Sequence, residues 1–79
     1  MRTILFTLPT CPKCLLAKDL LEIKGIDFEY VDASTPDGMK LVQKYGVGKV
    51  PALIVLGDDG NIHDSARGFN EIDSLISHE

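Results

Sequence analysis

The sequence predicts an α/β domain with the element order β-α-β-α-β-β-α, in which a four-stranded mixed sheet carries helices on both faces. Short apolar segments alternate with helical patterns early in the chain, which is typical of parallel strand pairing. The run 52–56 contains no polar residue, which indicates a central strand covered on both faces. The turn sequence Gly-Asp-Asp-Gly at 57–60 follows at once and predicts an antiparallel hairpin.

A first strand is predicted at 2–7, where β-branched and aromatic residues dominate. A helix should follow at 13–24, with Pro12 in its first turn, where the missing N–H costs no hydrogen bond. We expect its core-facing stripe to consist of apolar residues at helical spacing: Leu16, Leu20 and Ile23, widened by Leu15, Ala17 and Leu21. Gly25 is expected just after the helix end, with Ile26 making the contact that accompanies such an end.

The second strand and second helix are predicted from 27–32 and from the Thr35-Pro36 pair, which suits an N-cap followed by the first helical position. Gly46 is expected to end this helix. Its inner face should consist of three residues at helical spacing: Leu41, Val42 and Tyr45.

The last two elements are predicted as a return strand at 61–65 and a short helix capped by Asn70. The inward residues of that helix should be Ile72, Leu75 and Ile76.

Length and charge exclude several classes of protein. With 79 residues the chain suffices for one domain, 1–79. A net charge of −4 argues against nucleic-acid binding, and the apolar runs are too short to span a bilayer. The first ten residues lack the cleavage site of a secretory signal. We therefore expect a cytoplasmic monomer.

Cys11 and Cys14 are the only cysteines, and they are separated by Pro12 and Lys13. Two thiols at this spacing lie one helical turn apart and can form a disulfide with little backbone movement. If Cys11 lies at the helix N-terminus, unpaired backbone N–H groups and the helix dipole favour its thiolate. Cys11 would then attack, and Cys14 would resolve the mixed disulfide.

A metal site is the alternative reading of the cysteine pair. Structural zinc takes about four nitrogen or sulfur ligands, and only His63 and His78 could join the two thiols. Neither histidine stands at zinc-finger spacing, so we expect no metal, and we interpret His63 as an exposed residue of the hairpin.

The chain resembles small thioredoxin-fold proteins of the glutaredoxin and redoxin group. The resemblance rests on Cys11-Pro12-Lys13-Cys14 after the first strand, Val50-Pro51 before the third, and Gly68-Phe69 before the last helix. It implies a thiol–disulfide oxidoreductase with a redox-active disulfide and no tightly bound cofactor. It also implies protein disulfides as substrates, with ribonucleotide reductase as one candidate.

In that group the proline matching Pro51 is cis and faces the active disulfide. The resemblance therefore implies a cis Val50-Pro51 bond and a Val50 backbone free to pair with an extended substrate peptide. Phe69 is expected in the core or at the rim of the site. For Lys13 and Lys49 two readings stay open: an ammonium that favours the Cys11 thiolate, or a solvated lysine.

The electron donor is predicted from departures from the glutathione-binding pattern of the family. Lys49 stands where glutathione-using members carry threonine, Arg67-Gly68 replaces a glycine pair, and Asn70 stands near an expected aspartate. The Gly68-Phe69 segment is closer to redoxins recharged by thioredoxin reductase. We expect thioredoxin reductase as the donor, with glutathione as the alternative. A non-catalytic binding module is a further alternative, which the two intact cysteines oppose.

Overall fold

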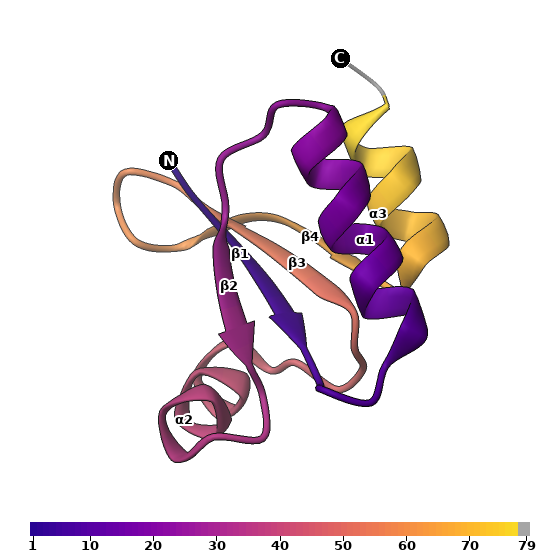
Figure 1. The fold of residues 1–79 in the computed structure, drawn as a ribbon. Coiled ribbons are helices and arrows are strands. Elements are labelled where there is room, and N and C mark those ends of the chain that lie inside the picture. Colours follow the sequence, from indigo (N-terminus) through magenta and orange to yellow (C-terminus); the bar gives the residue numbers. More distant parts are fainter. Residues whose placement is uncertain (78–79) are drawn as a thin grey trace.

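A computed structural model describes residues 1–77 of the chain, and Figure 1 shows their arrangement. The elements follow the predicted order: β1 (Arg2–Thr7), α1 (Pro12–Ile23), β2 (Glu29–Asp32), α2 (Pro36–Tyr45), β3 (Ala52–Leu56), β4 (Ile62–Arg67) and α3 (Phe69–Ile76). The strand order in the sheet is β2-β1-β3-β4. The β1–β2 pair is parallel, whereas β1–β3 and β3–β4 are antiparallel. The predicted mixed sheet of four strands is confirmed.

The sheet separates two apolar clusters, as side-chain alternation along β1 and β3 requires. On one face, α1 and α3 lie side by side and cover the first cluster, whereas α2 covers the other face (Figure 1). The first cluster comprises Leu5, Ala17, Leu21, Leu53, Ala66, Ile72 and Ile76. The second comprises Ile4, Phe6, Val47, Ala52, Ile54 and Leu56. β3 is therefore a central strand buried on both sides, as its composition predicts.

The stripe predicted to bury α1 is confirmed in part. Ala17 and Leu21 are buried together with Cys14, and Leu20 is half-buried at the edge of the first cluster. The prediction is wrong for Leu15, Leu16 and Ile23, which are 57%, 54% and 81% exposed. Positions 14, 17 and 21 share one helix face, and the small side chain at position 17 lets that face lie close to the sheet.

The predicted end of α1 is confirmed. Gly25 has the left-handed φ of +71°. Its N–H donates to the Glu22 carbonyl at 3.0 Å, and the Ile26 N–H donates to the Leu21 carbonyl at 3.0 Å. These two bonds form a Schellman motif, and the Ile26 side chain packs against the first cluster.

The N-terminus of α2 is fixed to the end of β2. The Thr35 hydroxyl accepts a hydrogen bond from the Gly38 N–H at 3.0 Å and donates one to the Asp32 carbonyl at 3.0 Å. Thr35 is therefore the N-cap, as predicted. Gly38 approaches β2 so closely that an added Cβ would overlap the Asp32 carbonyl oxygen. Gly46, with φ of +66°, ends the helix as expected.

Two strands differ in length from their predicted ranges. β2 begins at Glu29 rather than at residue 27, because its pairing with β1 begins at Ile4 opposite Glu29. β4 extends to Arg67 because Ala52, the first residue of β3, pairs with Arg67. His63 is exposed on β4, as expected.

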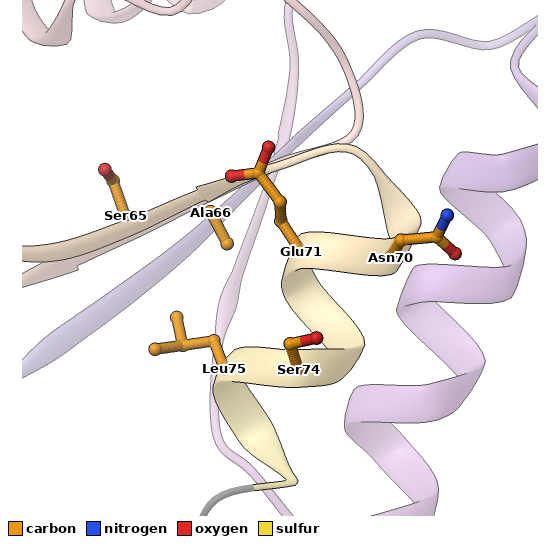
Figure 2. A pocket seen from close by; sticks show the side chains of 6 residues that line it. All are labelled: Ser65, Ala66, Asn70, Glu71, Ser74 and Leu75. Carbon is orange, nitrogen blue, oxygen red and sulfur yellow. The ribbon is translucent and has the colours of Figure 1, made fainter.

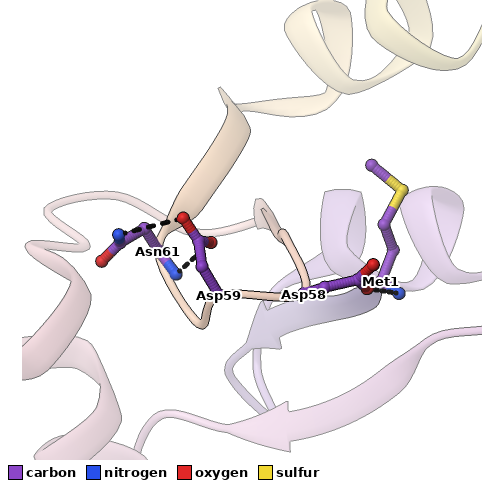
Figure 3. A network of polar contacts seen from close by, with 4 residues as sticks. All are labelled: Met1, Asp58, Asp59 and Asn61. Atoms are coloured by element: carbon purple, nitrogen blue, oxygen red, sulfur yellow. Dashed lines mark hydrogen bonds and ion pairs between the residues drawn. The ribbon is translucent and has the colours of Figure 1, made fainter.

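The hairpin between β3 and β4 is held by local polar contacts, which Figure 3 shows. The Asn61 N–H donates to Asp59 Oδ1 at 3.1 Å, and the Met1 ammonium lies 3.2 Å from Asp58 Oδ1. The backbone donor from Asn61, helped by its side-chain amide, holds the pKa of Asp59 below its ordinary value. These contacts lie where β1 begins, at the end of the sheet opposite to the one from which the cysteine segment leaves.

The expectation that Asn70 caps α3 is wrong. The helix begins at Phe69 and its N-cap is Gly68, whose φ of +85° lets the chain turn directly from β4 into the helix. Glu71 links the first turn of the helix to the end of β4, because its carboxylate accepts a hydrogen bond from the Arg67 N–H at 3.2 Å. Ile72 and Ile76 are buried and Leu75 is half-buried, as predicted. Within residues 1–77, no helix is long and apolar enough to cross a membrane.

Candidate active site

Cys11 and Cys14 are joined by a disulfide at the start of α1. The chain turns after β1, and the Cys11 N–H donates to the Leu8 carbonyl at 3.2 Å. Cys11 is the N-cap of α1, and its Sγ accepts a hydrogen bond from the Cys14 N–H at 3.2 Å. A sulfur atom therefore occupies the position at which a helix N-terminus presents unpaired N–H groups.

The two sulfur atoms differ in their access to solvent. Cys14 is fully buried in the first turn of the helix, whereas Cys11 is half-buried. Pro12 and Lys13, between them, are exposed. A disulfide partner arriving from solvent therefore meets the Cys11 side of the bridge first.

The Val50–Pro51 peptide bond is cis, as the family resemblance implies. Pro51 is buried, and the half-buried Val50 packs against the second cluster. The Pro51 carbonyl accepts a hydrogen bond from the Gly68 N–H at 2.7 Å. This bond joins the segment before β3 to the turn before α3.

Lys49 lies against the same turn. Its Nζ is 3.4 Å from the position that a Cβ on Gly68 would occupy, and its Cε is 3.5 Å away. Arg67 contacts the end of α2, with Nη2 donating to the Gly46 carbonyl at 3.3 Å. The structure therefore brings together Lys49, Pro51 and Gly68, three residues that the sequence assigns to one site.

Lys13 and Lys49 are both exposed, and in the described part of the chain neither has a carboxylate within 4.0 Å. Whether either ammonium favours the Cys11 thiolate stays a prediction. Phe69 is half-buried and packs against the first cluster, so its contacts are those of a core residue.

A groove of about 330 Å³ adjoins the cysteine segment on its α2 side. Its lining is mostly apolar: Leu8, Ala33, Met39, Val42, Gln43, Val47, Gly48, Lys49 and Val50. Leu8 links the groove to the cysteine segment, because its carbonyl accepts the hydrogen bond from the Cys11 N–H. Leu8 and Met39 line this groove although the sequence does not predict either of them as a site residue. The signal for Leu8 is the antiparallel pairing of Phe6 with Ala52, which places the residues after β1 beside those before β3.

A second hollow, of about 370 Å³, lies between β4 and α3 (Figure 2). Ser65, Ala66, Asn70, Glu71, Ser74 and Leu75 line it. Asn70, which stands near an expected aspartate of the glutathione-binding pattern, is among them, but neither cysteine nor any residue of the Val50–Pro51 segment is. No group of three or more metal-ligating side chains occurs within residues 1–77. His78 lies outside the described residues.

The chain is similar to known redox proteins over most of its length. The family model described as Glutaredoxin matches residues 3–59. The SPbeta prophage-derived thioredoxin-like protein YosR of Bacillus subtilis is 35% identical over 78 residues, which cover 96% of this chain and 95% of that protein. A glutaredoxin-like 8.6 kDa protein of the rubredoxin operon of Clostridium pasteurianum is 40% identical over 75 residues, with coverage of 91% and 93%.

A solved structure resembles the whole chain. The glutaredoxin-like protein NrdH-redoxin from Escherichia coli superposes with a TM-score of 0.72 at 26% identity, and the match covers 100% of this chain and 96% of that one. The work that describes it attributes a thioredoxin-like activity profile to that protein.

Proposed function

The chain belongs to the glutaredoxin family and is a thiol–disulfide oxidoreductase with the redox disulfide Cys11–Cys14, and on that premise we propose that it reduces protein disulfides and is recharged by thioredoxin reductase. We place this activity in the cytoplasm, where reductases keep thiols reduced. Ribonucleotide reductase is one candidate substrate.

The proposed reaction starts from the dithiol form. The Cys11 thiolate attacks one sulfur of the partner's disulfide, so that a mixed disulfide forms and the other partner sulfur leaves as a thiolate. Cys14 then loses its proton and attacks Cys11 Sγ, which releases the second partner thiolate. Two electrons have moved to the partner, and the Cys11–Cys14 disulfide has formed. Two electrons from the donor restore the dithiol.

The observation that carries these roles is the position of Cys11 Sγ at the helix N-cap. The Cys14 N–H is placed to stabilise a negative charge on that sulfur, and the aligned peptide dipoles of α1 act in the same direction. The burial of Cys14 supports its role as the resolving residue, because it is reached through Cys11 rather than from solvent.

Three positions favour thioredoxin reductase over glutathione as the donor. Lys49 and Arg67 stand where the glutathione-using members of the family present smaller groups to the tripeptide, and Asn70 lies inside α3 rather than at its cap. The thioredoxin-like activity profile of NrdH-redoxin supports the same reading by similarity. The Val50 backbone is our proposed pairing site for an extended peptide of the substrate.

A coupled assay tests the proposal. The oxidised protein is supplied with NADPH and either thioredoxin reductase, or glutathione with glutathione reductase, and NADPH consumption is followed with insulin as the protein disulfide. We expect turnover with thioredoxin reductase. Turnover with glutathione alone would assign the chain to the glutathione-dependent glutaredoxins. No NADPH consumption with either donor, and no acceleration of insulin reduction when dithiothreitol replaces the donor system, would favour a non-catalytic binding module.

A further inference from the structure

β4 lies at one edge of the sheet, and within residues 1–77 no strand pairs with its outer side. Along a strand of an antiparallel pair, successive residues direct their N–H and C=O groups to opposite sides. The Gly68 N–H donates to the Pro51 carbonyl, so the N–H of Ala66, two residues earlier, also points toward β3. The N–H and C=O groups of Ser65 and Arg67 therefore point away from the sheet.

Carboxylates occupy both of these outward N–H donors. The Ser65 N–H donates to Asp64 Oδ1 at 2.9 Å, and the Arg67 N–H donates to Glu71 Oε1 at 3.2 Å. Asp64 belongs to β4 itself, whereas Glu71 extends from the first turn of α3 toward the strand (Figure 2). Within residues 1–77 neither carboxylate forms a salt bridge, so the backbone N–H is the donor that holds each of them.

The other end of β4 is irregular. Val55 pairs with Asp64 and Leu56 pairs with Ile62, so the register shifts and His63 is an extra residue on β4. Such a bulge bends a strand and interrupts a straight edge. The regular part of the edge is therefore 64–67, and its two outward donors are the ones that the carboxylates occupy.

We propose that the outer edge of β4 is a latent interface for a second copy of this chain, which Asp64 and Glu71 keep closed. Two copies related by a twofold axis can lie antiparallel with Ser65 of each opposite Arg67 of the other. Since each copy offers two outward N–H donors, four hydrogen bonds would form in this register. The same four donors are held by carboxylates in the single chain.

A second copy fits this edge because the pattern of donors and acceptors is complementary to itself. Ser65 and Arg67 are two residues apart in both copies, so each N–H meets a C=O of the partner strand. The twofold axis would pass beside Ala66, whose small side chain leaves room for its counterpart. The hollow of about 370 Å³ between β4 and α3 lies along this edge, so α3 does not cover it.

The test compares the wild-type protein with D64A/E71A and D64N/E71Q by sedimentation velocity over a range of concentrations, in dithiothreitol so that no disulfide joins two chains. D64A/E71A lacks the oxygen atoms that hold the donors, and we expect its apparent mass to rise about twofold as dimers form. D64N/E71Q is the matched control. It carries the same net charge as D64A/E71A but keeps an amide oxygen at each position, so it should stay at the mass of one chain, like the wild-type protein.

Two further measurements locate the interface. Adding Ser65→Pro to D64A/E71A removes one outward N–H from each copy without removing a bond to β3, so the dimer should dissociate. In dilute, monomeric protein, the amides of Ser65 and Arg67 should exchange with deuterium faster in D64A/E71A than in the wild-type protein. If D64A/E71A does not fold, as judged by circular dichroism, Asp64→Ala and Glu71→Ala replace it, since each frees one donor.

Four outcomes would overturn the inference. D64A/E71A that stays at the mass of one chain at every concentration contradicts the latent interface, and so does a dimer that survives Ser65→Pro. Association of D64N/E71Q equal to that of D64A/E71A would show that charge, rather than the occupied donors, keeps the copies apart. A wild-type dimer that Ser65→Pro abolishes would show that the edge is open in the native protein.

Discussion

The Gly68 N–H donates a hydrogen bond to the Pro51 carbonyl across 2.7 Å, and this bond ties the segment before β3 to the start of α3. Gly68 can do so because its φ is +85°, a conformation that residues with a Cβ rarely adopt. The same glycine leaves room for Lys49, which lies over it.

Gly68→Ala is expected to lower the free energy of unfolding by roughly 1–3 kcal/mol, because Gly68 has φ +85° and ψ 158°, a backbone region that essentially only glycine adopts. It should also displace Lys49 and lower reductase activity. Gly60→Ala is the matched control, since Gly60 has φ of +83° but nothing within 4 Å of its Cβ position. Urea unfolding should show a loss in both variants, and insulin reduction a loss in Gly68→Ala alone. Equal activity in the two variants would contradict a role for this turn in the site.

Substitution of each cysteine should separate the attacking role of Cys11 from the resolving role of Cys14. Cys11→Ser is expected to abolish disulfide reduction, whereas Cys14→Ser should retain the first step and accumulate a mixed disulfide with the substrate. Mass spectrometry of the trapped adduct checks this outcome. In the reduced wild-type protein iodoacetamide should label Cys11 before Cys14, and the reverse order would exchange the assignments.

Gly38→Ala should destabilise the protein, although alanine usually favours a helix by about 0.5–1 kcal/mol over glycine. The new Cβ would overlap the Asp32 carbonyl oxygen and lie 2.8 Å from the carbonyl carbon, so α2 must move away from β2. We expect a loss of about 1–3 kcal/mol in urea unfolding. Gly48→Ala is the control, because its Cβ position is open and its φ is not left-handed. A stabilised Gly38→Ala would contradict this close contact.

The decrease in the free energy of unfolding at acid pH should depend on Asp32. The Ser34 hydroxyl and then the Ser34 backbone N–H donate to its carboxylate at 2.6 and 2.8 Å and hold its pKa below the ordinary value of 3.8. The folded state therefore favours the ionised form. The stabilisation is complete above the ordinary pKa and is lost as pH falls through the lower pKa of the folded state.

The variant Asp32→Asn should flatten the dependence of unfolding free energy on pH below about pH 4. Thermal unfolding measured across that interval checks the slope for both proteins. Parallel curves for the wild-type protein and Asp32→Asn would show that the Ser34 contacts do not distinguish the two protonation states.

The sequence predicts the ends of the elements well where a local motif decides them. Thr35-Pro36 specifies the start of α2, and Gly25 with Ile26 specifies the end of α1, because each motif satisfies backbone groups within a few residues. The site formed by Cys11 and Cys14 can be predicted equally well from the sequence, because its chemistry depends on the spacing of two residues along one helix.

The buried face of α1 could not be predicted in the same way. Leucines occur at positions 15, 16, 20 and 21, so apolar residues surround much of the helix and their spacing does not select one face. The choice depends on Ala17, whose small size allows close packing on the sheet. The position of the α3 cap also depends on strand pairing. Asn70 is not the cap because β4 continues to Arg67 and Gly68 makes the turn into the helix.

The strand order β2-β1-β3-β4 has a consequence for amide hydrogen exchange. Inner strands open to solvent only in larger unfolding events, whereas edge strands such as β2 and β4 open at lower free energy. The loop that carries Cys11 leaves β1, and the segment that carries Pro51 enters β3. Both segments are therefore anchored to the two strands in which deuterium uptake should be slowest, so fraying at either edge of the sheet leaves their spacing intact.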